Sequence, residues 1–167
     1  MTFAMQGLVD FLVVSRAHTY AGGKQAEVDL GNPSSKRKRY QWSNGLWTVN
    51  ESYIGKTTSR VSEIVSYDGK EVWELTSRGG IILRNIHPYV NGKTEEQLVE
   101  DIFDFLRICL SAVDVTFPVR GPREFSDRDL RYVNTHNGPL DNFLGSETIY
   151  FRDSDVYHRR YQGGLII

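Results

Sequence analysis

The chain has little of several features that would point directly to a function. Its 167 residues include one cysteine, Cys109, which excludes a disulfide framework and a thiolate metal cluster within the chain. The formal net charge is −1, so there is no overall electrostatic attraction to nucleic acid or to a membrane surface. The apolar run at residues 8–14 is interrupted by Asp10 and is too short to cross a bilayer. We therefore expect a cytoplasmic protein that makes no membrane contact.

Motifs for catalysis and for metal binding are also missing. The sequence contains no phosphate-binding glycine loop, no nucleophile elbow and no zinc-protease motif. The four histidines are scattered, and Asp153 and Asp155 lack the further ligands and the glycine of a calcium loop. Cys109 falls on the apolar stripe of a predicted helix, which indicates a small core residue rather than a nucleophile. The sequence thus predicts no cofactor and no metal, and it does not favour an enzyme.

The clearest pattern is an internal correspondence at an offset of 84 residues. At this offset residues 62–67 fall on 146–151, and similar residues recur as far as the last strand. The pair Gly79-Gly80 falls on Gly163-Gly164, which favours bends or bulges at these sites over phosphate-binding loops. A fixed internal period predicts a duplicated unit. We therefore expect a single domain, 1–167, made of two repeats at about 5–82 and 98–166.

Each half is predicted to contain one helix followed by four antiparallel strands. Apolar residues at helical spacing predict the first helix over residues 3–17, and Thr94 to Gln97 matches a capping box that begins the second. Asn44-Gly45 and Asp68-Gly69 are typical of tight hairpin turns. The predicted fold class is α+β: an internally duplicated helix plus four-stranded antiparallel unit, with two helices packed on one face of an antiparallel sheet.

The strand register predicts which side chains share a face. A two-residue turn at Asp68-Gly69 would pair Val65 with Val72, and alternation then separates the two faces. Four apolar residues are expected beneath the helices: Val65, Val72, Ile149 and Val156. The opposite face would carry Ile64, Trp73, Leu75, Thr148, Tyr157, Arg159 and Tyr161. Rings combined with a cation and hydroxyls suit a ligand surface. The alternative is a half-exposed face, or one covered by the polar loop 24–38, which is predicted to be exposed.

The same register gives one candidate acid–base pair. Glu147 is expected opposite His158 on the helix-facing side of the sheet. A carboxylate raises the basicity of an imidazole beside it, so the pair could transfer protons. The alternative is an exposed cross-strand pair at a strand end, which contributes little.

Four segments together resemble a known family: Thr19-Tyr20-Ala21, Gly69 to Trp73, Phe117-Pro118-Val119-Arg120-Gly121-Pro122, and Tyr161 to Ile166. The chain is similar, over nearly its whole length, to a bacterial domain family of unknown function. Some members are fused to an N-terminal helix-turn-helix, so the resemblance implies a sensing or regulatory role. Residues 76–79 depart from the aromatic-rich run that members often have at this place, and the chain has no helix-turn-helix of its own.

These observations favour a non-catalytic domain that senses a small ligand or a partner. The partner would be a small anionic or aromatic molecule, or a protein. The predicted ligand-binding residues are Tyr20, Trp73, Arg120, Tyr157, Arg159 and Tyr161. Arg120 lies between two prolines, which suits a preorganised anion contact. Its alternative role is structural, bonding carbonyl groups of the connector.

Two other functions compete with ligand sensing. Basic and aromatic residues interleave at 39–42, 131–132 and 159–161, as a surface that stacks the bases of single-stranded nucleic acid requires. Binding of single-stranded nucleic acid by the sheet face is therefore the second hypothesis. A hydrolase-like enzyme that uses Glu147 and His158 is the third.

Overall fold

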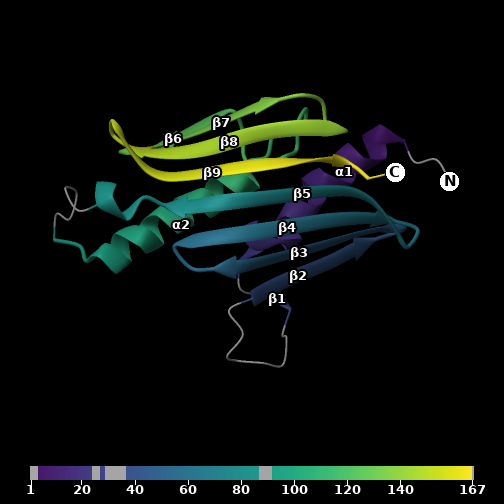
Figure 1. The fold of residues 1–167 in the computed structure, drawn as a ribbon, viewed down its shortest axis with the longest axis horizontal. Coiled ribbons are helices and arrows are strands. Elements are labelled where there is room, and N and C mark those ends of the chain that lie inside the picture. The colour runs from purple at the N-terminus through teal and green to yellow at the C-terminus, as the bar shows by residue number, and fades with distance from the viewer. Residues whose placement is uncertain (1–3, 24–26, 29–36, 87–91, 167) are drawn as a thin grey trace.

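A computed structural model describes residues 4–23, 27–28, 37–86 and 92–166 (Figure 1). In this part of the chain there are two α-helices, α1 (Met5–Ser15) and α2 (Glu95–Ser111), and three 3-10 turns, η1 (Arg16–His18), η2 (Tyr20–Gly22) and η4 (Leu83–Asn85). The strands are β1 (Glu27–Val28), β2 (Arg37–Asn44), β3 (Trp47–Gly55), β4 (Thr58–Tyr67), β5 (Lys70–Ile81), β6 (Glu124–Asp127), β7 (Leu130–Asn137), β8 (Asn142–Phe151) and β9 (Ser154–Leu165).

The described strands form one continuous antiparallel sheet of nine, in the order β1-β2-β3-β4-β5-β9-β8-β7-β6. The predicted fold class is therefore wrong, because the strands do not form separate four-stranded units. Two findings overturn it. β5 and β9 pair along the register from Trp73↔Leu165 to Ile81↔Tyr157, and β1 adds a strand beyond β2. β1 lies in the segment predicted as the exposed loop 24–38; residues 24–26 and 29–36 of that loop lie outside the described residues.

Local sequence signals set the turns and the start of α2. Asp68 and Gly69 both adopt positive φ, 50° and 73°, as a tight turn between antiparallel strands requires. At the start of α2, the Thr94 hydroxyl accepts a hydrogen bond from the Gln97 N–H at 3.2 Å, and the Gln97 side-chain oxygen accepts one from the Thr94 N–H at 2.9 Å. The predicted capping box and the Asp68-Gly69 turn are confirmed.

A bulge in each of two hairpins changes the register beyond the turn. In β4–β5, Val65 pairs with Trp73 and Ser66 with Glu71, which leaves Val72 as an extra residue. In β8–β9, Ile149 pairs with Tyr157 and Tyr150 with Asp155, so Val156 is the extra residue there. The two bulges lie 84 residues apart, and the bounds of β4 and β8, and of β5 and β9, show the same offset.

The bulges overturn the prediction of which side chains face away from the helices. Because the extra residue and its neighbour turn the same way, Val72 and Trp73 are both buried, and so are Val156 and Tyr157. Burial of Val65, Val72, Ile149 and Val156 is confirmed. Trp73, Leu75, Tyr157, Arg159 and Tyr161 were expected on the opposite face, but they are buried as well.

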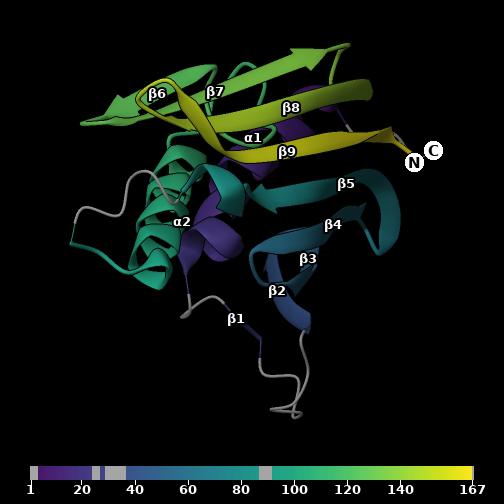
Figure 2. The ribbon, with the colours of Figure 1, turned by 60° about the vertical axis from the view of Figure 1, so that its left-hand side comes forward.

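Both helices lie on one side of the sheet, which we call the inner face (Figures 1 and 2). Leu8, Phe11 and Leu12 of α1 pack in one core cluster with Val49 and Trp73. In the second cluster, α2 contributes six residues, Val99, Ile102, Phe105, Leu106, Cys109 and Leu110. Cys109 is fully buried in this cluster, which confirms its interpretation as a core residue, and burial raises the pKa of its thiol to about 12. Within the described ranges, neither helix combines the length and apolarity needed to span a membrane.

We expect Val156→Ala to lower the free energy of unfolding by about 1–3 kcal/mol, because it removes two methyl groups from a side chain that is 1 % exposed. Urea denaturation measures the change. The matched control is Val115→Ala, at a position that is 64 % exposed. Equal effects at the two positions would contradict the burial of Val156.

Candidate functional site

A cavity of about 510 Å³ lies between the inner face of the sheet, α2 and the segment that follows α1. The sheet contributes Glu51, Tyr53, Tyr157 and Arg159 to its lining. Phe103, Leu106 and Arg107 of α2 form the opposite wall, and Tyr20 and Arg120 come from the segments that follow the two helices. The volume is typical of small-molecule sites, and the lining mixes rings with charged groups.

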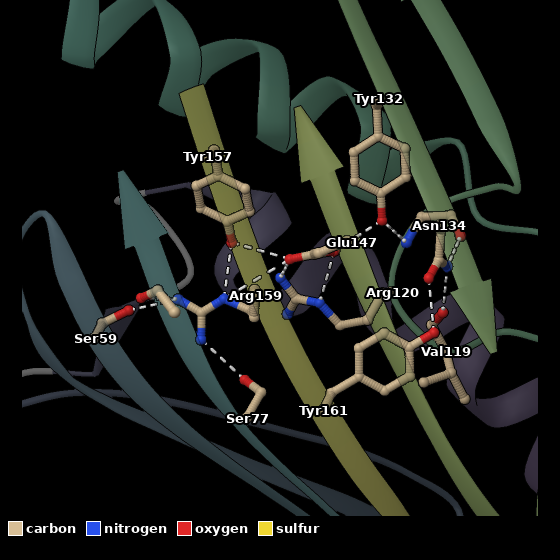
Figure 3. Close-up of polar contacts among 12 residues, drawn as sticks. Ser59, Ser77, Val119, Arg120, Tyr132, Asn134, Glu147, Tyr157, Arg159 and Tyr161 are labelled. Atoms are coloured by element: carbon tan, nitrogen blue, oxygen red, sulfur yellow. Dashed lines mark hydrogen bonds and ion pairs between the residues drawn. The ribbon is translucent and has the colours of Figure 1, made fainter. Parts of the chain in front are cut away.

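A buried carboxylate, Glu147, is bonded to Arg120 and Tyr157, two of the residues that line this cavity (Figure 3). Arg120 donates to it from Nε at 3.1 Å and from Nη2 at 2.5 Å. The hydroxyls of Tyr132 and Tyr157 also donate to Glu147, at 2.7 Å and 2.9 Å. Arg159 Nε lies 3.7 Å from the same carboxylate. Two buried cations therefore share one buried counterion.

This environment shifts the pKa of Glu147 and of the two phenols that donate to it. Burial alone would raise the pKa of Glu147, but the Arg120 charge and the donated hydrogen bonds bring it below the ordinary value. The phenols respond in the opposite sense. Burial and the nearby carboxylate raise the pKa of Tyr132 and of Tyr157, so both remain hydroxyl donors at neutral pH. The cluster is thus held as a fixed ion pair with neutral donors.

The Phe-Pro-Val-Arg-Gly-Pro segment forms the connector after α2, and its geometry accounts for the residues in it. Arg120 adopts a left-handed conformation, with φ at 64°, which turns its side chain towards Glu147. The next N–H, of Gly121, donates to the Tyr132 hydroxyl at 3.0 Å. A Cβ atom at Gly121 would lie 2.8 Å from the Tyr132 ring, so the close approach requires glycine. The segment's residues therefore serve to fix the arginine and the tyrosine.

A second buried ion pair lies beside the first. Arg16, which follows α1, donates to both oxygens of Glu63 at 2.8 Å and 2.9 Å. The same guanidinium donates to the carbonyl of Pro118 at 3.2 Å. Arg16 thus ties the segment after α1 to the connector after α2.

Glu51 differs from the other buried carboxylates because the described part of the chain gives it no bonded cation. It is 2 % exposed, lies directly opposite Glu63 in the β3–β4 register, and accepts a hydrogen bond from the Tyr20 N–H at 2.9 Å. Burial and the charge of Glu63 raise the pKa of Glu51 to about 7. Asn134, which is paired with Glu147 as Glu51 is with Glu63, instead bonds two backbone carbonyls and the Tyr161 hydroxyl. Glu51 is therefore a group of the cavity lining whose charge can change near neutral pH.

The structure brings together four of the six predicted ligand-binding residues. Tyr20, Arg120, Tyr157 and Arg159 line the cavity. The other two, Trp73 and Tyr161, do not. Trp73 is fully buried and donates to the Leu140 carbonyl at 3.0 Å, and Tyr161 is 3 % exposed and donates to Asn134 at 2.6 Å.

The acid–base pair of the enzyme hypothesis and the rings of the nucleic-acid hypothesis do not lie where those hypotheses placed them. Glu147 faces inward and pairs with Arg159, whereas His158 pairs with Thr148 and is bonded to its hydroxyl at 3.0 Å. The bulge shifts this register by one residue, so the expected Glu147–His158 pair does not form. Likewise, Tyr40 and Tyr132 are buried and present no ring for base stacking on the face away from the helices.

Several cavity residues were missed, namely Lys38, Glu51, Tyr53, Phe103 and Arg107. One signal for Glu51 was present: it alternates with Val49, which is fully buried, so β3 carries an acid at an inward position. For metal ions, the described residues contain no group of three or more His, Cys, Asp or Glu side chains that could hold one.

The described residues thus form a domain with one antiparallel sheet of nine strands, two helices on its inner face and a charged cavity beneath α2. The chain belongs to the family described as domain of unknown function (DUF5680), whose model matches residues 50–166. The matched range includes Glu51, Glu63, Arg120, Glu147 and Arg159, but not Arg16 or Tyr20. No curated protein and no solved structure gives a significant match to the chain.

Glu147→Gln should lower the free energy of unfolding at pH 7 by on the order of 3–5 kcal/mol, because it leaves Arg120 and Arg159 buried without a counterion. Urea denaturation gives the value, and Glu124→Gln, at an exposed position, is the control. A loss below about 1 kcal/mol would show that the two arginines do not depend on this charge.

Glu51→Gln should stabilise the fold at pH 8 and have little effect at pH 4.5. A carboxyl whose pKa is raised to about 7 in the folded state costs stability as the pH rises from its unfolded value to 7, and glutamine avoids that cost. The expected gain is on the order of 1–3 kcal/mol. Unfolding free energies across this pH range test it, with the exposed cavity-rim variant Glu100→Gln as control. A gain that does not vary with pH would contradict the shift.

Proposed function

We propose that this chain is a non-catalytic sensing domain that binds a small anionic, aromatic ligand in the cavity beneath α2. The observation that carries the proposal is the buried charge at the inner end of the cavity. Arg120 and Arg159 line it and share the single charge of Glu147, so one positive charge is left over whenever Glu51 is protonated. An anion placed there would supply the missing counterion.

The rest of the lining supports an aromatic body on that ligand. The Tyr20 and Tyr53 rings meet edge to face with centroids 5.7 Å apart, and Arg107 lies over the Tyr20 ring at 5.1 Å. Rings arranged in this way give a flat ligand a large contact area. A regulatory role belongs to the same proposal, because the resemblance is to a bacterial family in which some members are fused to a helix-turn-helix.

Glu51 links binding to protonation. A bound anion beside Glu51 disfavours its charged form and raises its pKa further above 7. Anion binding at pH 7.5 should therefore be accompanied by net proton uptake of up to one proton per ligand. A cationic ligand would do the reverse and release a proton below pH 7.

Calorimetric titration with salicylate, in buffers of different ionisation enthalpy, tests both parts of the proposal. Salicylate should bind with proton uptake, whereas its neutral analogue salicylamide should bind more weakly and without it. Val61→Phe, which fills the cavity from β4, should abolish binding, and Val133→Phe, on a half-buried strand position outside the cavity, should not. If a panel of aromatic carboxylates gives neither heat nor a melting shift, or if Val133→Phe is equally harmful, the proposal is wrong.

A further inference from the structure

The face of the sheet away from the helices, which we call the outer face, carries a row of arginines. Arg60 of β4 pairs directly with Arg78 of β5, and Arg78 pairs directly with Arg160 of β9. The row continues through Ile54, the partner of Arg60, to Arg37 of β2. All four arginines are exposed, and they line a groove of about 520 Å³. From β2 to β9 the row crosses four strand spacings, or roughly 19 Å.

Contacts within the described residues do not account for the three adjacent arginines of this row, Arg60, Arg78 and Arg160. Like charges directly opposite each other on neighbouring strands destabilise a sheet. Arg60, Arg78 and Arg160 form no ion pair with any residue that the structure describes. The chain as a whole carries a formal charge of −1, so the row is a local concentration of charge and not the result of a basic composition. Such an arrangement is stabilised when an anion lies along it.

We propose that the arginine row binds the phosphate backbone of a nucleic-acid strand that lies across the sheet, independently of the cavity. Guanidinium groups donate in a planar fork that matches phosphate oxygens. The hydroxyls of Ser62 and Thr76 lie in the same groove and add donors of the kind that contact phosphates. Along the axis of a duplex, where one strand carries a charge every 3.4 Å, a row of roughly 19 Å spans five to six charges.

The surroundings of the row favour phosphates over an acidic protein. Stable protein interfaces depend on buried aromatic or aliphatic groups at their centre. Here the large apolar side chain beside the arginines is Ile54, which is 40 % exposed. The groove lining also includes no exposed aromatic ring, so bases have no stacking surface and binding should not depend on their sequence.

Fluorescence anisotropy with a labelled 20-nucleotide DNA strand, at 50 to 200 mM salt, tests the inference. Four contacts predict a slope of about −3 for the logarithm of the binding constant against the logarithm of salt concentration. The double variant Arg78→Gln/Arg160→Gln should reduce the magnitude of this slope by about 1.4 and weaken binding at 50 mM salt at least tenfold. The matched control is Arg84→Gln/Arg123→Gln, which removes the same charge at exposed positions outside the groove. Mixed-sequence and thymidine strands should bind alike.

Competitors separate the possible sources of the anion. A duplex of the same length should compete, because it presents the same phosphodiesters, whereas polyglutamate at equal charge should not. The proposal is overturned if the strand does not bind at 50 mM salt or if the two double variants lose affinity equally. It is also overturned if inorganic polyphosphate binds and the nucleic acid does not, or if polyglutamate competes. Arg78→Gln/Arg160→Gln should leave the salicylate titration unchanged, so that failure of this site and failure of the cavity are distinguishable.

Discussion

One extra residue in each of two strands determines which side chains lie on each face of the sheet. Val72 in β5 has no register partner in β4, and Val156 in β9 has none in β8. Beyond these two residues, every side chain lies on the face opposite to the one that pairing without a bulge would give. Arg159 consequently faces inward to the cavity, and Arg160 faces outward to the arginine row. Without the bulge, the two would exchange faces, and the cluster around Glu147 would lose its second cation.

The buried polar cluster holds the two halves of the molecule to the same site. Arg16 follows the first helix and donates to the carbonyl of Pro118, in the connector after the second helix. Arg120, in the same connector, donates to Glu147. Arg16 and Arg120 each bind a carboxylate, which offsets the desolvation of those two charges, whereas Arg159 shares Glu147 with Arg120. Glu51, by contrast, is a buried carboxylate to which the described residues bring no bonded cation, and it lines the cavity.

Sequence reasoning reached the local features and failed on the long-range ones. The turn at Asp68-Gly69 and the cap at Thr94 depend on neighbouring residues, so they were predictable from the chain alone. The pairing of β5 with β9 depends on segments that are far apart in the sequence, and no local pattern specifies it. The bulges carry no strong sequence signal, because Val72 and Val156 suit either face. Arg120 and Tyr20 were found through their rigid or glycine-rich segments, whereas Trp73 and Tyr161 were assigned to the wrong face by the missing bulge.

The central pairing of β5 with β9 also determines how the chain can reach its folded state. Its partners are between 76 and 92 residues apart, from Ile81↔Tyr157 to Trp73↔Leu165, whereas hairpins such as β4–β5 close over a few residues. Local hairpins form in microseconds, but a contact of such separation must first overcome the entropy of a long closed loop. Among the described strands, the middle of the sheet is therefore the most non-local pairing, and we expect it to close more slowly than the hairpins on either side of it.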